Sequence, residues 1–349
     1  MGDIIVQKYG GSSVGTTEKI ITIAKRLIER KKTNPKIVVV VSAMGDTTDD
    51  YISLAKEITD TPDKRELDVL MSTGEMISAS LLAMSLKSMG CDAISYNAYQ
   101  LDIQTSGTHG KSLIDDIDVS KIEKSLDEGK IVVVTGFQGL DDIGDITTLG
   151  RGGSDTSAVA LAVKLNGKCE IYTDVDGIYF TDPRKFKDAK KLEEIEYEEM
   201  LELASLGAQV MHSRSIELAQ KYQIELYVGL SCSDIKGTYI RGMKNMKLED
   251  KVITGLATSD DDVAITIDID EEKIVDLFES IANENISMDM ISQTAPINSS
   301  NITVSFTIPK EDLVKAKEIV SKYVLKNKII IDENITKLSL VGLGMKHTS

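Results

Sequence analysis

"IIVQKYGGSSVGTTEKI", residues 4–20, runs from an apolar segment through two adjacent glycines into a helical pattern. A strand that enters a helix through glycines presents free backbone N–H groups and the positive end of the helix dipole to an anion. Gly10 and Gly11 would let the backbone approach phosphate oxygens, and Lys8 could reach the same oxygens from the strand end. The lysine of a P-loop should follow Gly15 and is missing, so this is not a P-loop. The alternative is a turn whose glycines only satisfy geometry.

Further apolar runs and helical patterns alternate behind this stretch. Strands are predicted at residues 36–43, 131–139 and 169–177, and helices at 17–31, 76–85, 158–165 and 194–205. The run "KIVVVVSA" is typical of a strand buried on both faces. This alternation predicts an α/β fold with a mostly parallel sheet that is covered on both faces. Ligands of such folds bind beyond the carboxyl ends of the strands.

The pattern changes after the polar segment 237–251. The order of predicted elements becomes β-α-β-β-α-β, which indicates a ferredoxin-like unit. Its strands are "VAITIDI" (263–269), "ISMDMIS" (286–292), "ITVSFTI" (302–308) and "TKLSLVGLG" (336–344), and its helices cover 271–285 and 311–324. We therefore predict two domains, residues 1–245 and 246–349.

Composition excludes several classes of protein. The chain has 349 residues and a formal net charge of −16, which argues against binding nucleic acid or an anionic membrane. No apolar stretch is expected to cross a bilayer. Three widely spaced cysteines form neither a disulfide framework nor a metal cluster, as in a cytoplasmic protein with reduced thiols. At this net charge, binding a nucleotide would call for deliberately placed cations and the help of a divalent metal.

A second glycine turn lies in "TTLGRGGSDTSAVALA", residues 147–162. Arg151 could clamp a carboxylate bidentately, supported by the amides of Gly152 and Gly153. Ser154 and Asp155 are good helix N-caps, which is the structural alternative for both. An aspartate beside an anion site is costly unless it orients a cation, a lysine or an N–H group.

Two other stretches are candidates. In "LMSTGEMISASLLA", Glu75 is predicted in the first turn of a helix, either to complement the helix dipole or to neutralise a substrate amine. In "YTDVDGIYFTDPR", Tyr179 could face a base and Arg184 a phosphate, unless the segment is an ordinary turn. The serine and threonine hydroxyls of "SAMGDTTD", residues 42–49, are suited to contacts with a carboxylate. The sequence has no Ser-His-Asp arrangement, zinc spacing or protein-kinase signature.

The motifs "KYGGSSV", "STGE", "GFQG", "GDITTLGRGGSDTSA" and "YTDVDGIYFTDPR", in this order, resemble those of the aspartate kinases. The resemblance covers essentially the whole chain. It implies the amino-acid kinase fold, a three-layer α/β sandwich, followed by a ferredoxin-like ACT domain. It also implies phosphorylation of the side-chain carboxylate of L-aspartate by Mg²⁺-ATP, the first step toward lysine, methionine and threonine.

The resemblance assigns roles by position. The residues implied to hold the ATP phosphates are Lys8, Gly10, Gly11 and Ser12. Those implied to line the nucleotide site are Thr173, Asp174, Tyr179 and Arg184. Those implied to bind aspartate are Arg151 and its neighbours Gly152 and Gly153 for the α-carboxylate, Glu75 for the amine, and Thr47 and Ser154. Asp155 would orient Lys8 and the reacting groups. No metal ligand is assigned to a protein side chain.

The resemblance also implies a homodimer or higher homo-oligomer that is inhibited by lysine, threonine or both. Met288, Asp289 and Gln293, within "ENISMDMISQT", are the candidate effector residues. The chain departs from the pattern in two places. Gln209 stands where many relatives carry a lysine near ATP. The family usually ends in two ACT units, whereas residues 263–341 complete one, so the second is expected to be truncated, and the role of residues 246–262 is left open.

Two other functions are compatible with these motifs. One is a kinase of another carboxylate, such as glutamate or acetylglutamate. The other is a non-catalytic amino-acid sensor, which should have lost a phosphate or carboxylate clamp. Lys8, Glu75, Arg151 and Asp155 are all present, which favours the enzyme.

Overall fold

The computed structural model describes residues 4–206, 210–242, 253–284, 286–294 and 301–342. They form two compact units. The first contains the described residues up to Gly255 and those from Val341 onward, and the second is Leu256–Leu340. The boundary expected at residue 245 falls outside the described residues.

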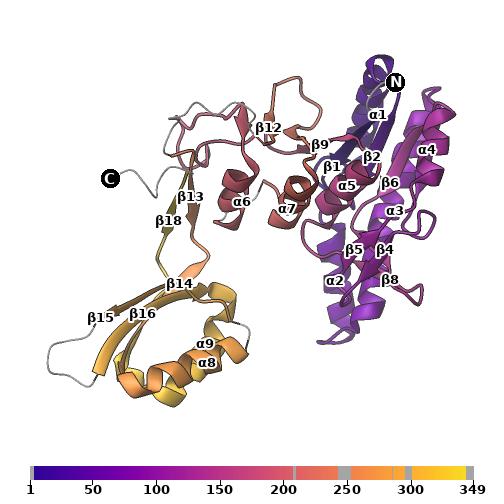
Figure 1. Cartoon of the computed structure of the whole chain (residues 1–349). Helices are drawn as coiled ribbons and strands as arrows, with labels where there is room; N and C mark the ends of the chain where they lie inside the picture. The colour runs from indigo at the N-terminus through magenta and orange to yellow at the C-terminus, as the bar shows by residue number, and fades with distance from the viewer. Residues whose placement is uncertain (1–3, 207–209, 243–252, 285, 295–300, 343–349) are drawn as a thin grey trace. The chain divides into compact units, whose positions relative to one another are not determined.

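The first unit is built on a sheet that has eight strands within the described ranges, in the order β10-β12-β11-β9-β1-β2-β6-β3. Figure 1 labels β12, β9, β1, β2 and β6 of this sheet. Neighbouring strands are parallel except the pair β11–β12. The strands are β1 (Ile5–Tyr9), β2 (Ile37–Val41), β3 (Ala93–Tyr96), β6 (Ile131–Thr135), β9 (Lys168–Thr173), β10 (Glu194–Ile195), β11 (Leu226–Leu230) and β12 (Thr238–Ile240). Every residue of β2 and β6 is buried, which explains their continuous β-branched runs.

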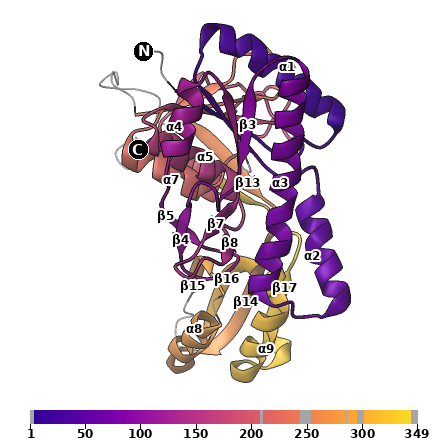
Figure 2. The same ribbon diagram turned by 90° about the vertical axis from the view of Figure 1, so that its right-hand side faces the viewer.

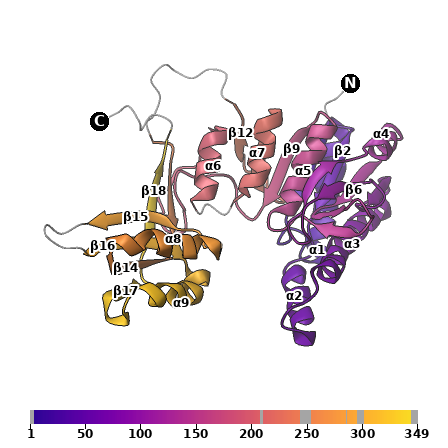
Figure 3. The ribbon, with the colours of Figure 1, turned by 60° about the horizontal axis from the view of Figure 1, so that its bottom comes forward.

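Helices cover both faces of this sheet and complete a three-layer sandwich (Figure 3). Tyr9 of β1 packs in one core cluster with α1 (Thr17–Thr33) and α3 (Lys64–Ser88). The preceding Lys8 points the other way, to Asp155 of α5 (Gly153–Lys164), because side chains alternate along a strand. The remaining helices of this unit are α2 (Thr47–Ile58), α4 (Ser120–Asp127), α6 (Tyr197–Ser205) and α7 (Ser213–Tyr222).

Helix α3 is longer than the sequence pattern indicates (Figure 2). It begins at Lys64, where Asp63 accepts a hydrogen bond from the Glu66 amide, so the predicted helix 76–85 is only its second half. With 25 residues and a mean hydropathy of 1.4 in its most apolar window, it is long and apolar enough to cross a membrane. Half of that window is buried inside the protein, and Asp68 and Ser78 are buried along the helix. These features are typical of a core helix.

A smaller sheet, with four strands in the described part of the chain, has the order β5-β4-β7-β8. Its strands are β4 (Gln104–Ser106), β5 (Leu113–Asp116), β7 (Gln138–Leu140) and β8 (Ile146–Thr148). The run 131–139, predicted as one strand, is divided between β6 and β7. The break is at Phe137, whose φ of +70° is incompatible with a strand.

The second unit has the ACT-type β-α-β-β-α-β arrangement, with α8 (Ile274–Asn283) and α9 (Leu313–Tyr323) on one face of the sheet (Figure 3). The sheet order in the described residues is β15-β16-β14-β17. Its strands are β14 (Asp262–Asp270), β15 (Asp289–Thr294), β16 (Asn301–Pro309) and β17 (Ile329–Asp332). Three single-turn 3₁₀ helices are η1 (Glu271–Lys273), η2 (Lys310–Asp312) and η3 (Lys326–Lys328).

The last strand of this unit was predicted wrongly. "TKLSLVGLG" contains β18 (Lys337–Val341), but β18 pairs with β13 (Gly255–Ser259) in a separate two-stranded ribbon. The fourth strand of the ACT-type sheet is β17, which pairs with β14. Only four residues long and half exposed, β17 has a weaker sequence pattern than β18.

Candidate active site

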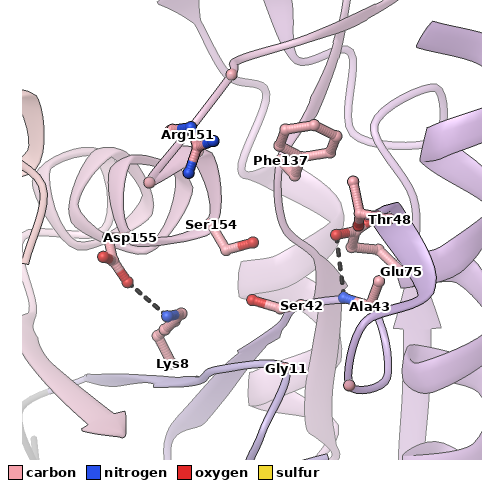
Figure 4. A pocket seen from close by; sticks show the side chains of 14 residues that line it. Lys8, Gly11, Ser42, Ala43, Thr48, Glu75, Phe137, Arg151, Ser154 and Asp155 are labelled. Carbon is pink, nitrogen blue, oxygen red and sulfur yellow. Dashed lines mark hydrogen bonds and ion pairs between the residues drawn. The ribbon is translucent and has the colours of Figure 1, made fainter. Parts of the chain in front are cut away.

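A cavity of about 250 Å³ lies beyond the carboxyl ends of β1, β2 and β6, at the start of α5. The polar and charged side chains that line it are Lys8, Ser42, Thr48, Glu75, Arg151, Ser154 and Asp155. In Figure 4, Lys8, Arg151 and Asp155 lie on one side, Glu75 and Thr48 lie opposite, and Ser154 lies between them. Several of the residues singled out in the sequence therefore meet in one cavity.

Lys8 and Asp155 form a largely buried ion pair. The Lys8 Nζ atom lies 2.6 Å from Asp155 Oδ1, and the two side chains are 12% and 10% exposed. The N-cap of α5 is Gly152, so the capping alternative for Asp155 does not apply. The carboxylate compensates the lysine charge and fixes its ammonium group at the cavity.

The first glycine turn is separate from the helix that follows it. Helix α1 begins at Thr17 and is capped by Thr16, whose hydroxyl accepts a hydrogen bond from the Lys19 amide. The helix thus begins after Thr16 and not at the glycines, and the phosphate site expected at its N-terminus stays a prediction. What remains is a turn whose Gly11 and Ser12 amides donate no hydrogen bond within the described residues.

Gly11 is required by close packing. A Cβ atom there would lie 2.9 Å from the carbonyl oxygens of Ala43 and Gly45. The Gly10 amide donates a hydrogen bond to the Tyr172 carbonyl of β9. The turn is thus held against the loop after β2 on one side and against the end of β9 on the other.

The second glycine turn enters α5 directly. Gly152 has a φ of +69°, and a Cβ atom there would lie 2.2 Å from the Cβ atom of His212. The Gly153 amide donates to the Gly150 carbonyl within the turn, so it is not free to bind a carboxylate as predicted. Arg151 extends from this turn into the cavity and has no ion-pair partner among the described residues.

Glu75 lies in the middle of α3, not in a first turn as predicted, which removes the helix-dipole explanation. Its side chain is buried, and Oε1 accepts a hydrogen bond from the Ala43 amide at 3.0 Å. Oε2 is also buried and has no hydrogen-bond partner in the described structure. Burial raises the pKa of Glu75 to about 8. A Cβ atom at Gly74 would lie 2.7 Å from the Ala43 Cβ atom, so the glycine permits this close approach.

The threonine that faces the cavity is not the predicted one. The Thr47 hydroxyl donates to the Met44 carbonyl at 2.5 Å, whereas its neighbour Thr48 lines the cavity. Ser154, on the first turn of α5, also lines it.

Phe137 also lines the cavity but was not among the predicted site residues. Its backbone is in the left-handed region, at a cost of about 1–3 kcal/mol. Its amide donates to the Ser157 hydroxyl, and its carbonyl accepts from the Leu149 amide. The surroundings therefore hold Phe137 in place. Phe137 belongs to the motif "GFQG", but the positive φ of a non-glycine residue has no signature in the sequence.

The predicted nucleotide-site residues do not line this cavity. Thr173 is the last residue of β9 and Asp174 follows it; β9 pairs with β1 and so ends beside the first glycine turn. The Tyr179 hydroxyl donates to Asp176, and Arg184 pairs with Asp182 with its side chain 85% exposed. Gln209 lies outside the described residues.

The predicted effector residues belong to the second unit. Asp289 pairs with Lys337 at 3.0 Å, and this contact lowers the pKa of the carboxyl group. Met288 packs against the core of the unit, and Gln293 is exposed on β15.

The described residues contain no group of three or more histidine, cysteine, aspartate or glutamate side chains that could hold a metal ion. All three cysteines are free thiols.

Two family models match the chain. The model described as the amino acid kinase family matches residues 3–229, and one described as an ACT domain matches residues 274–323. An aspartokinase of Geobacillus stearothermophilus is 45% identical over 347 residues, which cover 98% of this chain and 84% of that protein.

Solved structures share the fold. Aspartokinase III of E. coli, in complex with aspartate and ADP, superimposes with a TM-score of 0.76 at 24% identity, covering 97% of this chain and 88% of that one. Its complex with lysine and aspartate gives a TM-score of 0.77 at the same identity, covering 97% and 87%.

Proposed function

Because this chain belongs to the amino acid kinase family and is an aspartate kinase, we propose that its cavity binds L-aspartate and that ATP phosphorylates the side-chain carboxylate there. The product is 4-phospho-L-aspartate. One observation carries this proposal: buried Glu75, whose Oε2 has no hydrogen-bond partner, lines a cavity that also contains Arg151, which has no ion-pair partner among the described residues. These two groups complement the ammonium and α-carboxylate of an amino acid.

In this proposal Arg151 pairs with the α-carboxylate and Glu75 with the ammonium group of aspartate. Thr48 and Ser154 would add hydroxyl contacts, and Thr48 replaces the Thr47 that the resemblance implies. The Gly152 backbone would support the same carboxylate. The side-chain carboxylate of aspartate would then point toward Lys8.

Transfer of the phosphoryl group requires no general base, because an aspartate carboxylate is already a nucleophile. Catalysis then consists of positioning and neutralisation of charge. Lys8, held by Asp155, would stabilise the charge on the transferred phosphoryl group. The turn of Gly10, Gly11 and Ser12 would bind the other phosphate oxygens through the Gly11 and Ser12 amides, which donate no hydrogen bond within the described residues.

The nucleotide would extend toward the segment after β9. The residues proposed to contact it are Thr173, Asp174, Tyr179 and Arg184. Arg184 would have to leave Asp182 to reach a phosphate, a small cost because exposed ion pairs contribute about 0–1 kcal/mol. We expect Mg²⁺ to enter with ATP, to neutralise phosphate charge and to be held mainly by phosphate oxygens, since the described residues offer no cluster of ligands.

We also propose that lysine, threonine or both inhibit the enzyme through its ACT region, at Met288, Asp289 and Gln293. The lysine complex of the E. coli relative supports lysine as one effector. We expect a cytoplasmic homodimer or higher homo-oligomer, and light scattering after gel filtration would measure the oligomeric state. Assays with lysine and threonine, alone and together, test the regulation, and unchanged activity in all three would contradict it.

The activity is tested by offering aspartate, glutamate and acetylglutamate with Mg²⁺-ATP and trapping the acyl phosphate with hydroxylamine. We expect turnover of aspartate alone. Equal or faster turnover of glutamate would overturn the proposed substrate. Arg151→Ala should raise the KM for aspartate about tenfold or more and leave the KM for ATP nearly unchanged, since only the carboxylate clamp is removed.

A further inference from the structure

Arg214, the second residue of α7, carries a partly buried charge that no carboxylate compensates within the described residues. Its guanidinium donates from Nη1 to the Leu149 carbonyl at 2.9 Å and from Nη2 to the Ser112 carbonyl at 2.8 Å. Burial lowers the pKa of this group. A partly buried cation that is held by two carbonyl dipoles and no carboxylate is costly, so its two contacts should have a compensating role.

The two carbonyls belong to separate segments that meet beside the cavity. Leu149 follows β8 and lies two residues before Arg151, while Ser112 ends the loop between β4 and β5. The Ser112 amide donates to the Thr148 carbonyl at 3.0 Å. Arg214 therefore ties α7 to both segments at the point where the chain leaves β8 for the second glycine turn.

This turn needs an external anchor. Gly150 and Gly152 both have positive φ, at +76° and +69°. Glycine adopts positive and negative φ about equally readily, so these two residues do not by themselves fix the conformation of the turn. Arg151 between them is exposed and has no ion-pair partner among the described residues. Its position is consequently set by its backbone. Helix α7 supplies two constraints on that backbone: the contact of His212 with Gly152, and the hydrogen bond from Arg214 to Leu149.

We propose that Arg214 is a positioning residue for the reaction: it fixes the turn Leu149–Gly153, so that Arg151 is presented to the α-carboxylate of aspartate. This inference rests on the proposed function of Arg151. The planar fork of arginine is what allows two carbonyls to be held at once, and a lysine ammonium cannot reproduce that geometry.

The experiment compares Arg214→Gln and Arg214→Lys with the wild-type protein. Arg241→Gln is the matched control, because Arg241 also donates to two partners, but these are Glu194 and Glu225, which lie outside the second glycine turn. We expect Arg214→Gln to raise the KM for aspartate about tenfold, since small displacements of a clamp are costly. The KM for ATP should change less than about twofold, Arg214→Lys should recover part of the loss, and Arg241→Gln should resemble the wild type.

Several outcomes overturn the proposal. A folded Arg214→Gln protein whose KM for aspartate is unchanged, or whose KM for ATP rises equally, would do so. If Arg214→Gln does not fold, as judged by thermal melting, the KM for aspartate of Arg214→Lys decides, because lysine retains the charge but not the planar fork. An unchanged KM in this variant would overturn the proposal. A wild-type protein that does not turn over aspartate would instead contradict the proposed function. Amide hydrogen exchange separates failure of the anchoring role from failure of the proposed function, because it needs no activity measurement. Unchanged exchange at residues 149–153 in a folded Arg214 variant would overturn the anchoring role.

Discussion

The two walls of the cavity each contain a buried carboxylate, and the two carboxylates are compensated in different ways. Asp155, taken as a whole residue, is 7% exposed, and its side chain pairs with Lys8. Glu75 is 3% exposed, and its Oε2 has no partner among the described residues. The charge of the first wall is thus compensated inside the protein, while the second wall is complete only when a ligand brings a positive charge.

This difference separates two tasks. The Lys8–Asp155 wall is ready before any ligand binds, which suits a group that must stabilise charge during phosphoryl transfer. The Glu75 wall responds to the ligand, because an incoming ammonium group favours the charged carboxylate and lowers the raised pKa. The Lys8–Asp155 pair should therefore control the rate. Glu75, together with Arg151 beside the ion pair, should control the binding of aspartate.

The largest effect is expected from breaking the first wall. Lys8→Ala should lower kcat by about two orders of magnitude or more, because the cation that stabilises the transition state is removed. Steady-state kinetics would measure it. Lys19→Ala is the control, since the Lys19 ammonium also contacts the first glycine turn, at the Ser12 carbonyl, but is exposed. A near-normal kcat in folded Lys8→Ala would contradict the division between the walls.

The geometry of the first wall is tested next. Gly152→Ala should lower the free energy of unfolding by about 3 kcal/mol, because the new Cβ atom would meet His212 at 2.2 Å in a left-handed backbone. Gly144→Ala is the control: φ there is +86°, but no atom lies within 4 Å, so a loss of only about 1 kcal/mol is expected. Urea unfolding would measure both. Equal losses would mean that α7 moves aside readily.

The second wall is tested by pH. The folded protein retains a proton on Glu75 between its ordinary pKa of 4.5 and about 8, while the unfolded chain has lost it. The contribution of protonated Glu75 to the free energy of unfolding is therefore fully present below pH 4.5. It is lost as the pH rises from 4.5 through about 8. Without aspartate, Glu75→Gln should gain about 2 kcal/mol of stability relative to the wild type between pH 6 and pH 8.

Thermal and urea unfolding at the two pH values would measure this gain. Glu57→Gln, on the exposed face of α2, removes the same charge and should show no such change. If the free energies of unfolding of Glu75→Gln and the wild type changed in parallel with pH, Glu75 would already be charged in the empty cavity.

The smallest effect concerns the hydroxyls of the second wall. Thr48→Val should raise the KM for aspartate about threefold, the value of one ordinary hydrogen bond. Thr47→Val should leave that KM unchanged, since its hydroxyl is used by the Met44 carbonyl. The reverse result would place the substrate on the other side of the loop after β2.

The sequence predicts β1, β2, β6 and β9 of the main sheet, because they are apolar runs bounded by turn residues. It does not predict the other strands of this sheet, β3, β10, β11 and β12, which are short or lie toward its edges. It places Lys8, Arg151 and Asp155 at the same sheet edge for the same reason. It misplaces the start of α3 because "STGE" reads as a turn, although Gly74 only makes room for Ala43. Here tertiary packing overrides local propensity.

Other features have no local signal. The positive φ of Phe137, which divides one predicted strand into two, depends on contacts with Ser157 and Leu149, both distant in sequence. Thr48 faces the cavity and Thr47 does not. A shift of α2 by one residue would reverse this, and the sequence does not fix the start of a helix so closely. The pairing of β18 with β13 joins segments about eighty residues apart, and hydrophobic alternation alone does not choose between partners.

That ribbon has a consequence for the history of the chain. Because β13 and β18 pair, the second unit starts and finishes at adjacent points. A segment whose ends are neighbours can be inserted, exchanged or deleted as a single genetic cassette, with a short linker in its place. Recombination could thus fit one catalytic scaffold with different effector specificities, without altering a single residue that lines the cavity.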